Sequence, residues 1–383
     1  MGYGVYVHVP FCVQKCNYCS FVSYPISTVG SETLCRYCTN VLRERELLQS
    51  DLAEGFSPLS ASTVYIGGGT PTSLPGADLI RLTRGVLRQV NPSADAEISV
   101  EANPGTLTLS LLEALIENGV NRLSMGVQSF SEQALKSLGR IHSVEQALHA
   151  VNLAREAGFH NLSIDLIFGI PGQSLDDWKC TLETAISLGP EHISTYELSA
   201  EPGTKLDSWV REGAVRMPDE DLVVDMWELA HELLREAGYE HYEISNYAKP
   251  GFQCRHNLNY WRCGNYLGLG AAAHSHFDGI RWCNVDDPVE YCQKVERRSS
   301  PIAGLEQLSS TQRATEKFML ALRMAEGLDT QSLEDFGANL PDSWWAQVRL
   351  LEENGLLEVN GTRICPTPRG MLMNNVVSRM LAV

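Results

Sequence analysis

The sequence predicts an α/β protein in which six strand–helix units form a partial (β/α)6 barrel of the TIM type, followed by a small C-terminal domain. Three observations predict this fold class. Short apolar runs alternate with longer stretches whose apolar residues recur at helical period. Polar and glycine residues gather where the runs end, as they do at the active face of such barrels. The composition then shifts near residue 300.

The strands are expected where short apolar runs are bounded by polar residues or glycine. Between them, four helical patterns cover Ala77–Arg88, Leu109–Asn118, Val144–Glu156 and Leu175–Ser187. Strand–helix units in a row favour a parallel sheet with right-handed crossovers. The six expected strands are Val5–Val9, Thr63–Ile66, Glu97–Val100, Arg122–Gly126, Leu162–Phe168 and His192–Glu197.

A polar segment, Arg297–Pro301, is the expected boundary of the C-terminal domain. We expect a barrel in residues 1–245, a segment that closes it in 246–296, and a domain in 297–383. Helices followed by a short hairpin resemble a winged-helix-like domain. Its expected elements are helices over Ser310–Arg323, Asp329–Phe336 and Asp342–Asn354, strands over Leu356–Val359 and Thr362–Cys365, and a last helix from Pro368.

Three cysteines, Cys12, Cys16 and Cys19, crowd into eight residues directly after the first expected strand. Iron–sulfur clusters are held by cysteine thiolates, and three ligands on a 4Fe-4S cluster leave one iron open for chemistry. A zinc site or a disulfide knot is the alternative. Zinc modules usually pair two such knuckles, and no second half follows Cys19 at knuckle distance. The spacing therefore predicts a reactive 4Fe-4S site.

Charge and hydropathy restrict the partners. The formal net charge is −17, which argues against nucleic acid because binding to a phosphate backbone usually needs a basic face. No apolar run approaches the roughly 20 residues that span a bilayer, so any membrane contact is expected to be peripheral. With no recognisable signal peptide, we expect a cytoplasmic protein, where clustered cysteines suggest metal rather than disulfides.

Polar and glycine residues follow four of the expected strands. Gly67–Thr70 comes after the second strand, and its missing side chains would let the backbone approach a ligand. Glu101 ends the third strand, Gln128 ends the fourth, and Asp165 lies in the fifth. Each motif alone is weak, because a glycine triplet is often a turn and a strand-end carboxylate is often a structural cap. Their repetition at corresponding places predicts a ligand site.

With these residues in place, the sequence resembles the radical S-adenosylmethionine proteins, and within them the branch of oxygen-independent coproporphyrinogen III oxidase. The resemblance covers nearly the whole chain. It implies that Cys12, Cys16 and Cys19 hold a 4Fe-4S cluster and that Asp165 accepts from the ribose hydroxyls of S-adenosylmethionine. The residues that it implies for binding this cofactor are Tyr6, Gly68, Gly69, Thr70, Glu101, Gln128, Arg140 and Asp165.

Two departures distinguish this chain within the branch. The oxidases resemble CxxxCxxCxC and carry an N-terminal extension over the substrate. Here Phe21 stands in place of the extra cysteine, and the chain begins eleven residues before Cys12. Both features are similar to the HemW-type haem chaperones. The alternatives are an oxidase that decarboxylates coproporphyrinogen and a radical methyltransferase of the same branch.

A second motif, His256-Asn-Leu-Asn-Tyr-Trp261, resembles the haem-handling signature HNxxYW of the HemW-type group. A neutral imidazole is a good axial ligand for haem iron, and the neighbouring aromatic rings could lie against a porphyrin. His256 is therefore the expected haem ligand. Without the resemblance, a histidine near two aromatic residues is more often a packing residue. Cys254 is an alternative thiolate ligand, or otherwise a buried thiol.

Other conspicuous residues are expected to be structural. Cys35 and Cys38 spell CxxC but lie in an expected helix, Ser31 to about Asp51, where Cys38 falls on the apolar stripe. His274 and His276 lie in a glycine- and alanine-rich turn. The dipeptide Cys365-Pro366 is expected by chance.

The resemblance thus implies a chaperone that binds haem and delivers it to haem-requiring proteins, while the cluster and S-adenosylmethionine govern its state. It also implies that cluster and cofactor binding promote a homodimer. No residue is assigned a catalytic role, because the same cofactor machinery serves for catalysis or for control.

Overall fold

The structure is a computed structural model that describes residues 2–51, 60–334 and 340–381. A curved sheet fills its centre, with the order β14-β13-β12-β11-β1-β4-β5-β6-β7-β8-β10-β9. Adjacent strands from β11 through β1 to β8 run parallel. These parallel strands are β1 (Tyr3–Val9), β4 (Ala61–Gly68), β5 (Glu97–Ala102), β6 (Arg122–Gln128), β7 (Leu162–Phe168), β8 (His192–Glu197) and β11 (Tyr266–Leu269).

Antiparallel strands extend both ends of the parallel sheet. Beyond β8 lie β10 (Asn246–Ala248) and β9 (Glu240–Glu243). Beyond β11 lie β12 (His274–Phe277), β13 (Ile280–Asn284) and β14 (Ile302–Gln307). Because β14 and β9 are the two ends of the order, the described strands form an open barrel, and the predicted α/β partial barrel is confirmed. β14 belongs to this sheet although it follows residue 297, where the C-terminal domain was expected to begin. The position of that domain boundary stays a prediction.

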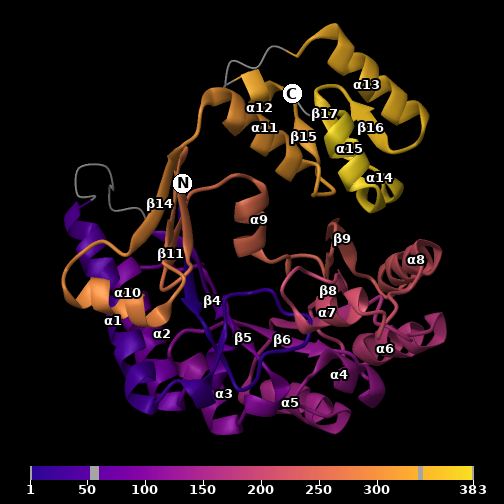
Figure 1. Cartoon of the computed structure of the whole chain (residues 1–383). Helices are drawn as coiled ribbons and strands as arrows, with labels where there is room; N and C mark the ends of the chain where they lie inside the picture. The colour runs from indigo at the N-terminus through magenta and orange to yellow at the C-terminus, as the bar shows by residue number, and fades with distance from the viewer. Residues whose placement is uncertain (1, 52–59, 335–339, 382–383) are drawn as a thin grey trace.

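Helices surround the outside of the curved sheet (Figure 1). Two of them, α5 and α6, begin at capping boxes on Ser143 and Ser174, which satisfy backbone N–H groups of the first turn. The expected helices are present within a few residues, and α4, α7, α8 and α10 are additional. The barrel helices are α1 (Ser31–Asp51), α2 (Gly76–Val90), α3 (Leu109–Glu117), α4 (Glu132–Leu138), α5 (Val144–Ala157), α6 (Leu175–Ser187), α7 (Lys205–Arg211), α8 (Glu220–Glu236) and α10 (Pro288–Glu296).

Successive side chains of the parallel strands lie in two different environments, on opposite faces of the sheet. Val5, Val7 and Val9 of β1 are buried in the main hydrophobic core, together with residues of α1 and α2. Tyr6 and His8, between them, point to the other side, because successive side chains of a strand alternate. The same alternation in the next strands gives a barrel with an apolar outside beneath its helices and a polar inside. This polar inside lines the cavity described below.

A second hydrophobic core contains buried apolar residues from Ala314 onward together with Tyr242, Ala248 and Leu258. A three-stranded sheet has the order β15-β17-β16, and the hairpin of β16 and β17 matches the expected one. The expected helix Asp329–Phe336 is shorter: strand β15 takes its first residue, the helix covers Gln331–Glu334, and the remainder lies outside the described residues. The elements are α11 (Ser310–Ala321), β15 (Leu328–Asp329), α12 (Gln331–Glu334), α13 (Asp342–Glu353), β16 (Leu357–Asn360), β17 (Arg363–Pro366), α14 (Pro368–Leu372) and α15 (Asn374–Met380).

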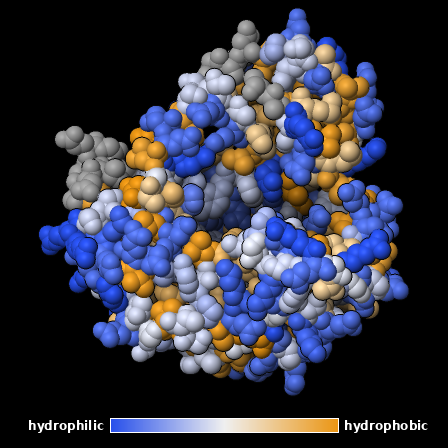
Figure 2. Space-filling model, viewed as in Figure 1, coloured by the Kyte–Doolittle hydropathy of each residue, from blue (hydrophilic) through white to orange (hydrophobic). Residues whose placement is uncertain are grey.

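A short helix, α9 (Arg255–Trp261), lies between the barrel and the C-terminal domain (Figure 1). It carries the sequence HNLNYW. Its neighbours in the barrel, Gly4, Thr63 and Glu97, lie at the beginnings of β1, β4 and β5, so α9 covers the N-terminal end of the barrel. Leu258 packs in the second hydrophobic core. Figure 2 shows this face of the molecule hollowed between the two parts.

Candidate functional site

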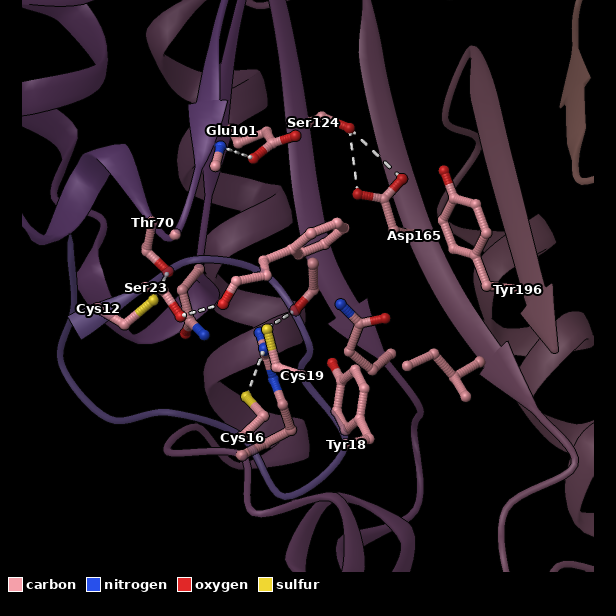
Figure 3. Close-up of a pocket in the computed structure, with 18 of the residues that line it drawn as sticks. Cys12, Cys16, Tyr18, Cys19, Ser23, Thr70, Glu101, Ser124, Asp165 and Tyr196 are labelled. Atoms are coloured by element: carbon pink, nitrogen blue, oxygen red, sulfur yellow. Dashed lines mark hydrogen bonds between the residues drawn. The ribbon is translucent and has the colours of Figure 1, made fainter. Parts of the chain in front are cut away.

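A cavity of about 460 Å³ opens inside the barrel. Its lining combines the segment that carries the three cysteines, residues 11–23 (the cysteine loop), with inward-facing residues of β4 to β8 and one residue of α9, Asn257. Figure 3 shows the three cysteines on one side of this space and Glu101, Ser124 and Asp165 across from them. The residues implied for cluster and cofactor binding that line it are Cys12, Cys16, Cys19, Gly68, Gly69, Thr70, Glu101, Gln128, Arg140 and Asp165.

The thiols of the cysteine loop face the cavity and have polar neighbours. The Arg140 guanidinium donates from Nη1 to Cys16 Sγ at 3.3 Å, and Thr70 Oγ1 lies 3.6 Å from Cys12 Sγ. Burial raises the pKa values of Cys12 and Cys19. No three metal-ligating side chains among the described residues converge on a single ion. A cluster of four irons is larger than one ion, so its ligands must stand further apart.

Glycines let strand β4 approach the cysteine loop. A Cβ on Gly69 would lie 2.7 Å from the Phe11 carbonyl oxygen and 2.9 Å from Cys12 Sγ, closer than real Cβ atoms come. Gly68 has a φ of +114°, and a Cβ there would meet the His8 ring at 2.6 Å. The missing side chain of Gly69 therefore lets the end of β4 lie directly against the loop. The approach of Gly67–Thr70 to a ligand stays a prediction.

Gln128 is held in a strained backbone conformation at the end of β6. Its φ is +70°, in the left-handed region that non-glycine residues rarely adopt, and the β6–β7 register shifts beside it. Its Oε1 atom is buried without a hydrogen-bond partner among the described residues, and so is Nε of Arg140. Strain and unpaired buried polar atoms collect at ligand sites. A polar ligand in the cavity would satisfy both atoms.

Glu101 and Asp165 are half-buried carboxyls with several donors each. Glu101 accepts from Tyr65 Oη at 2.8 Å and from the Gly68 N–H at 3.0 Å, and burial raises its pKa to about 7. Asp165 accepts from Ser194 at 2.7 Å and from Ser124 at 3.1 Å. Burial also raises the pKa of Asp165, while these hydroxyls oppose the rise. The hydroxyl groups around Asp165 match an acceptor for a ligand diol.

These observations fit the cluster and cofactor that the sequence predicted. Three thiols share one wall of the cavity with a guanidinium that stabilises thiolate charge. Two unpaired polar atoms and a carboxylate suited to a diol lie beyond them. A molecule with an ionic amino-acid end and a ribose could use both regions together.

Sequence reasoning missed several residues of the cavity. Tyr65, Ser124 and Ser194 orient the two carboxyls, and Arg122 places a buried guanidinium among them. Nε and Nη1 of Arg122 have no partner in the described part of the chain. For Arg122 and Ser124 the available signal was alternation, because both share parity with Gln128 on β6. Ser194 had no such signal, because β8 carries no predicted site residue.

Two predicted residues lie outside the cavity lining. Tyr6 is one layer below: its hydroxyl bonds His8 Nδ1 at 2.8 Å, and its ring stacks with that of Tyr65. His256 is buried, with Nδ1 2.8 Å from Thr63 Oγ1 and Nε2 2.9 Å from Tyr260 Oη. Burial lowers its pKa to about 3, so the imidazole is neutral. Both ring nitrogens are engaged within the protein.

Cys254, the alternative haem ligand, and the residues expected to be structural lie outside the cavity lining. Cys38 is buried in the main core and Cys35 is exposed. Cys254 is buried, and burial raises the pKa of its thiol to about 12. His276 Nδ1 lies 3.3 Å from the Gly264 carbonyl oxygen. Cys365 Sγ contacts the Glu326 carbonyl oxygen at 3.4 Å.

The whole sequence is similar to known proteins. Residues 6–185 match the Radical SAM superfamily and residues 308–373 match the HemN C-terminal domain. The heme chaperone HemW of Mycobacterium tuberculosis (strain CDC 1551 / Oshkosh) is 36% identical over 99% of this chain and 94% of its own. That of Bacillus subtilis (strain 168) is 36% identical over 98% and 97%. That of Escherichia coli (strain K12) is 44% identical over 71% and 69%.

The fold matches a solved structure over the full chain. Coproporphyrinogen III oxidase (HemN) from Escherichia coli, a radical SAM enzyme, superimposes with a TM-score of 0.84. The match covers 100% of this chain and 90% of that one at 24% sequence identity. This likeness establishes the architecture of barrel and C-terminal domain. In the described part of the chain, no helix has the length and apolarity to cross a membrane.

Proposed function

This chain belongs to the HemW family of radical SAM proteins, and we propose that it binds haem and delivers it to haem-requiring proteins. The observation that carries the proposal is the 36% identity to proteins named heme chaperone over nearly the whole of both chains. Phe21, in the place of a fourth cysteine, supports the same function over porphyrinogen oxidation. Partners would be proteins that accept haem. Cluster-dependent homodimer formation remains part of the proposal.

Membership in the radical SAM family implies a 4Fe-4S cluster and S-adenosylmethionine. We propose Cys12, Cys16 and Cys19 as the cluster ligands. Bound together, the two groups supply a 5′-deoxyadenosyl radical when an electron is available. The chain's own contribution is placement: Arg140 balances thiolate charge, while Gly68, Gly69 and Thr70 hold the loop close to β4.

The remaining cavity residues would bind the cofactor by hydrogen bonds. Gln128 and Arg140 offer the unpaired Oε1 and Nε atoms to the amino-acid end. Asp165 would accept from the ribose, in place of serine hydroxyls. Glu101 and Tyr65 form the wall between β4 and β5. Tyr6 would act from the layer beneath by supporting Tyr65.

His256 is the proposed haem ligand. Its neutral imidazole is the form that binds iron, and its ring stacks on Tyr65 with centroids 5.1 Å apart. For Nε2 to reach iron, the Tyr260 hydroxyl must leave it, and the buried helix α9 must open toward the macrocycle. Haem uptake would therefore include a movement of α9.

Haem titration of the anaerobically purified, cluster-loaded protein tests this proposal. Haem is expected to bind one equivalent per chain and to give a defined Soret band. In His256→Ala the band should shift or be lost, because the iron loses an axial imidazole. His149→Ala, at an exposed position on α5, is the matched control. An unchanged spectrum in His256→Ala would remove His256 from the site.

Replacing Cys16 with serine tests the cluster ligands. Cys16→Ser is expected to lose most of the iron–thiolate absorption and of the bound iron after reconstitution. Cys180→Ser changes an exposed cysteine on α6 and should keep both. A cluster retained in Cys16→Ser at the level of the control would mean that other cysteines hold it.

A further inference from the structure

We infer that a buried chain of hydrogen bonds couples the cofactor cavity to helix α9, so that ligand binding at Asp165 changes the affinity for haem. The chain runs from Asp165 through Ser163, His192 and Tyr242 to the backbone of Cys254. Cys254 is the residue that precedes α9. The inference rests on the proposed function, because it assigns that function a means of control.

The first half of the chain joins neighbouring strands inside the barrel. Ser163 and Asp165 are two residues apart on β7 and so share its inward face, and Ser163 Oγ lies 3.4 Å from Asp165 Oδ1. Ser163 is paired in register with His192 of β8. The His192 Nδ1 atom lies 2.8 Å from Ser163 Oγ. All three residues are thus fixed by strand register rather than by mobile loops.

The second half leaves the barrel for α9. His192 Nε2 lies 2.7 Å from Tyr242 Oη, and the backbone N–H of Cys254 donates to the same oxygen at 3.3 Å. His192 and Cys254 are fully buried and Tyr242 nearly so. Burial holds the pKa of His192 well below its ordinary value, so the ring is neutral. One of its nitrogens is therefore a donor and the other an acceptor.

One arrangement of hydrogens gives every donor an acceptor. The Cys254 N–H can only donate, so Tyr242 accepts it and donates its own hydroxyl hydrogen to His192 Nε2. His192 then carries its hydrogen on Nδ1 and donates to Ser163, whose hydroxyl donates to Asp165. All hydrogens point toward the carboxylate. A change in what Asp165 accepts therefore affects each bond back to α9.

The hydrogen bonds that end at Cys254 help to fix the first turn of α9. The next two N–H groups, of Arg255 and His256, donate to the Glu97 carboxylate at 3.0 and 3.1 Å. The first turn thus depends on two acceptors in the barrel, Tyr242 and Glu97. A buried donor left unpaired costs roughly 1–3 kcal/mol, enough to shift how readily α9 opens.

A ligand diol at Asp165 competes with the serine hydroxyls for the same two oxygens. When Ser163 loses its acceptor, its hydroxyl turns, and the donors behind it lose their common direction. α9 is then less firmly held and His256 is easier to release. Because coupling between two binding equilibria is reciprocal, haem must change the cofactor affinity by the same factor.

Haem titration with and without S-adenosylmethionine measures the coupling directly. The cluster-loaded full chain is used without reductant, so that the cofactor stays intact. We expect saturating S-adenosylmethionine to lower the haem Kd by about five-fold or more, the lower end of typical couplings. Haem should lower the Kd for S-adenosylmethionine by an equal factor, which can be measured by calorimetry.

Tyr242→Phe removes the middle link and should bring the Kd ratio close to one. Tyr239→Phe is the matched control. The Tyr239 hydroxyl donates to the Pro190 carbonyl oxygen and takes no part in the hydrogen bonds between Asp165 and Cys254, so this variant should keep the wild-type ratio. Ser163→Ala removes the hydrogen bonds between Asp165 and His192 with a smaller change of side-chain shape. It replaces Tyr242→Phe in the test if that variant folds poorly. If Tyr242 and Ser163 only stabilised the fold, their variants would bind haem more weakly by the same factor with and without S-adenosylmethionine, and the Kd ratio would not change.

The outcomes separate this inference from the proposed function. Wild-type protein that binds haem with the same Kd in both conditions overturns the coupling and leaves the chaperone function standing. A coupling that persists in both Tyr242→Phe and Ser163→Ala overturns the route through this chain. Wild-type protein that binds no haem overturns the proposed function itself.

Discussion

Gly69 sets how closely the cysteine loop approaches strand β4. Gly69→Ala would place a Cβ 2.7 Å from a backbone oxygen of the loop, and backbone cannot yield as a flexible side chain does. We expect the loop to shift and the reconstituted protein to hold less than half of the wild-type iron. Gly30→Ala is the control, because a Cβ there meets no heavy atom within 4 Å. Iron analysis and absorption spectra compare the two, and wild-type iron content in Gly69→Ala would contradict this reading of the loop.

At the residue scale, the chemistry of single positions was predictable where a pattern marked it. Two patterns predicted residues that line the cavity. They are the spacing of Cys12, Cys16 and Cys19 and the glycines at the end of β4. Ser124 and Ser194 belong to no such motif. Ser194 is paired in register with Asp165, and Ser124 is paired with Ser163, two residues before Asp165. His256 was marked by its motif, yet its burial and its two hydrogen bonds depend on contacts far away in sequence.

Helix α1 is tied to the far edge of the barrel by one buried carboxyl, Glu44. It accepts from Tyr291 Oη at 2.6 Å and from the Gly270 N–H at 2.8 Å. Burial raises its pKa from 4.5 to about 7. Because the folded state favours the protonated form, this contribution to stability is fully present below pH 4.5 and is lost as the pH rises to about 7.

Glu44→Gln should remove this dependence on pH. Between pH 5 and pH 8 the wild-type free energy of unfolding should fall, relative to that of Glu44→Gln, by up to about 3 kcal/mol. Urea titrations at both pH values measure the difference, and other titrating groups cancel because both proteins share them. A difference that does not change with pH would show that Glu44 is ionised throughout.

Helix α9 is also held from its C-terminal end by the C-terminal domain. Arg262, directly after the helix, forms a two-bond ion pair with Glu326 at 2.7 and 2.9 Å. The Arg323 guanidinium lies 4.5 Å above the Trp261 ring. Both partners belong to the turn between α11 and β15. This domain therefore contributes to keeping His256 enclosed.

Glu326→Gln should loosen α9. The pair is half-exposed, and exposed pairs contribute roughly 0.2–1 kcal/mol, so amide exchange in residues 255–261 should quicken by up to about five-fold. Exchanging the charges, Arg262→Glu with Glu326→Arg, should restore slow exchange. The control is Glu296→Gln, which breaks the similar Arg36–Glu296 pair between α1 and α10. Exchange as slow as wild type in Glu326→Gln would contradict a holding role for this pair.

At the element scale, the sequence predicted what depends on local periodicity. The six parallel strands and their crossover helices have clear patterns. The short helix α4, strand β11 and the hairpins after it were not expected, because short elements carry little periodicity. Their pairing is decided by distant strands: β11 joins the sheet beside β1, more than 250 residues earlier in the sequence.

Considered as a whole, the molecule places the two proposed sites at different levels along the barrel axis. The cysteine loop and the ends of β4 to β7 form one end, and α9 with the C-terminal domain covers the other. The polar interior connects them through Asp165, His192 and Tyr242. This arrangement was not predictable from sequence, because it requires knowing that the HNLNYW segment of α9 lies beneath the cavity.

The proposed function is that this chain handles haem rather than oxidising a porphyrinogen. The most direct measurement is a paired assay on one cluster-loaded preparation, in which haem is titrated beside turnover of coproporphyrinogen with reductant and S-adenosylmethionine. We expect one bound haem per chain with a defined Soret band and no accumulation of protoporphyrinogen. Accumulation of protoporphyrinogen without specific haem binding would contradict the proposed function.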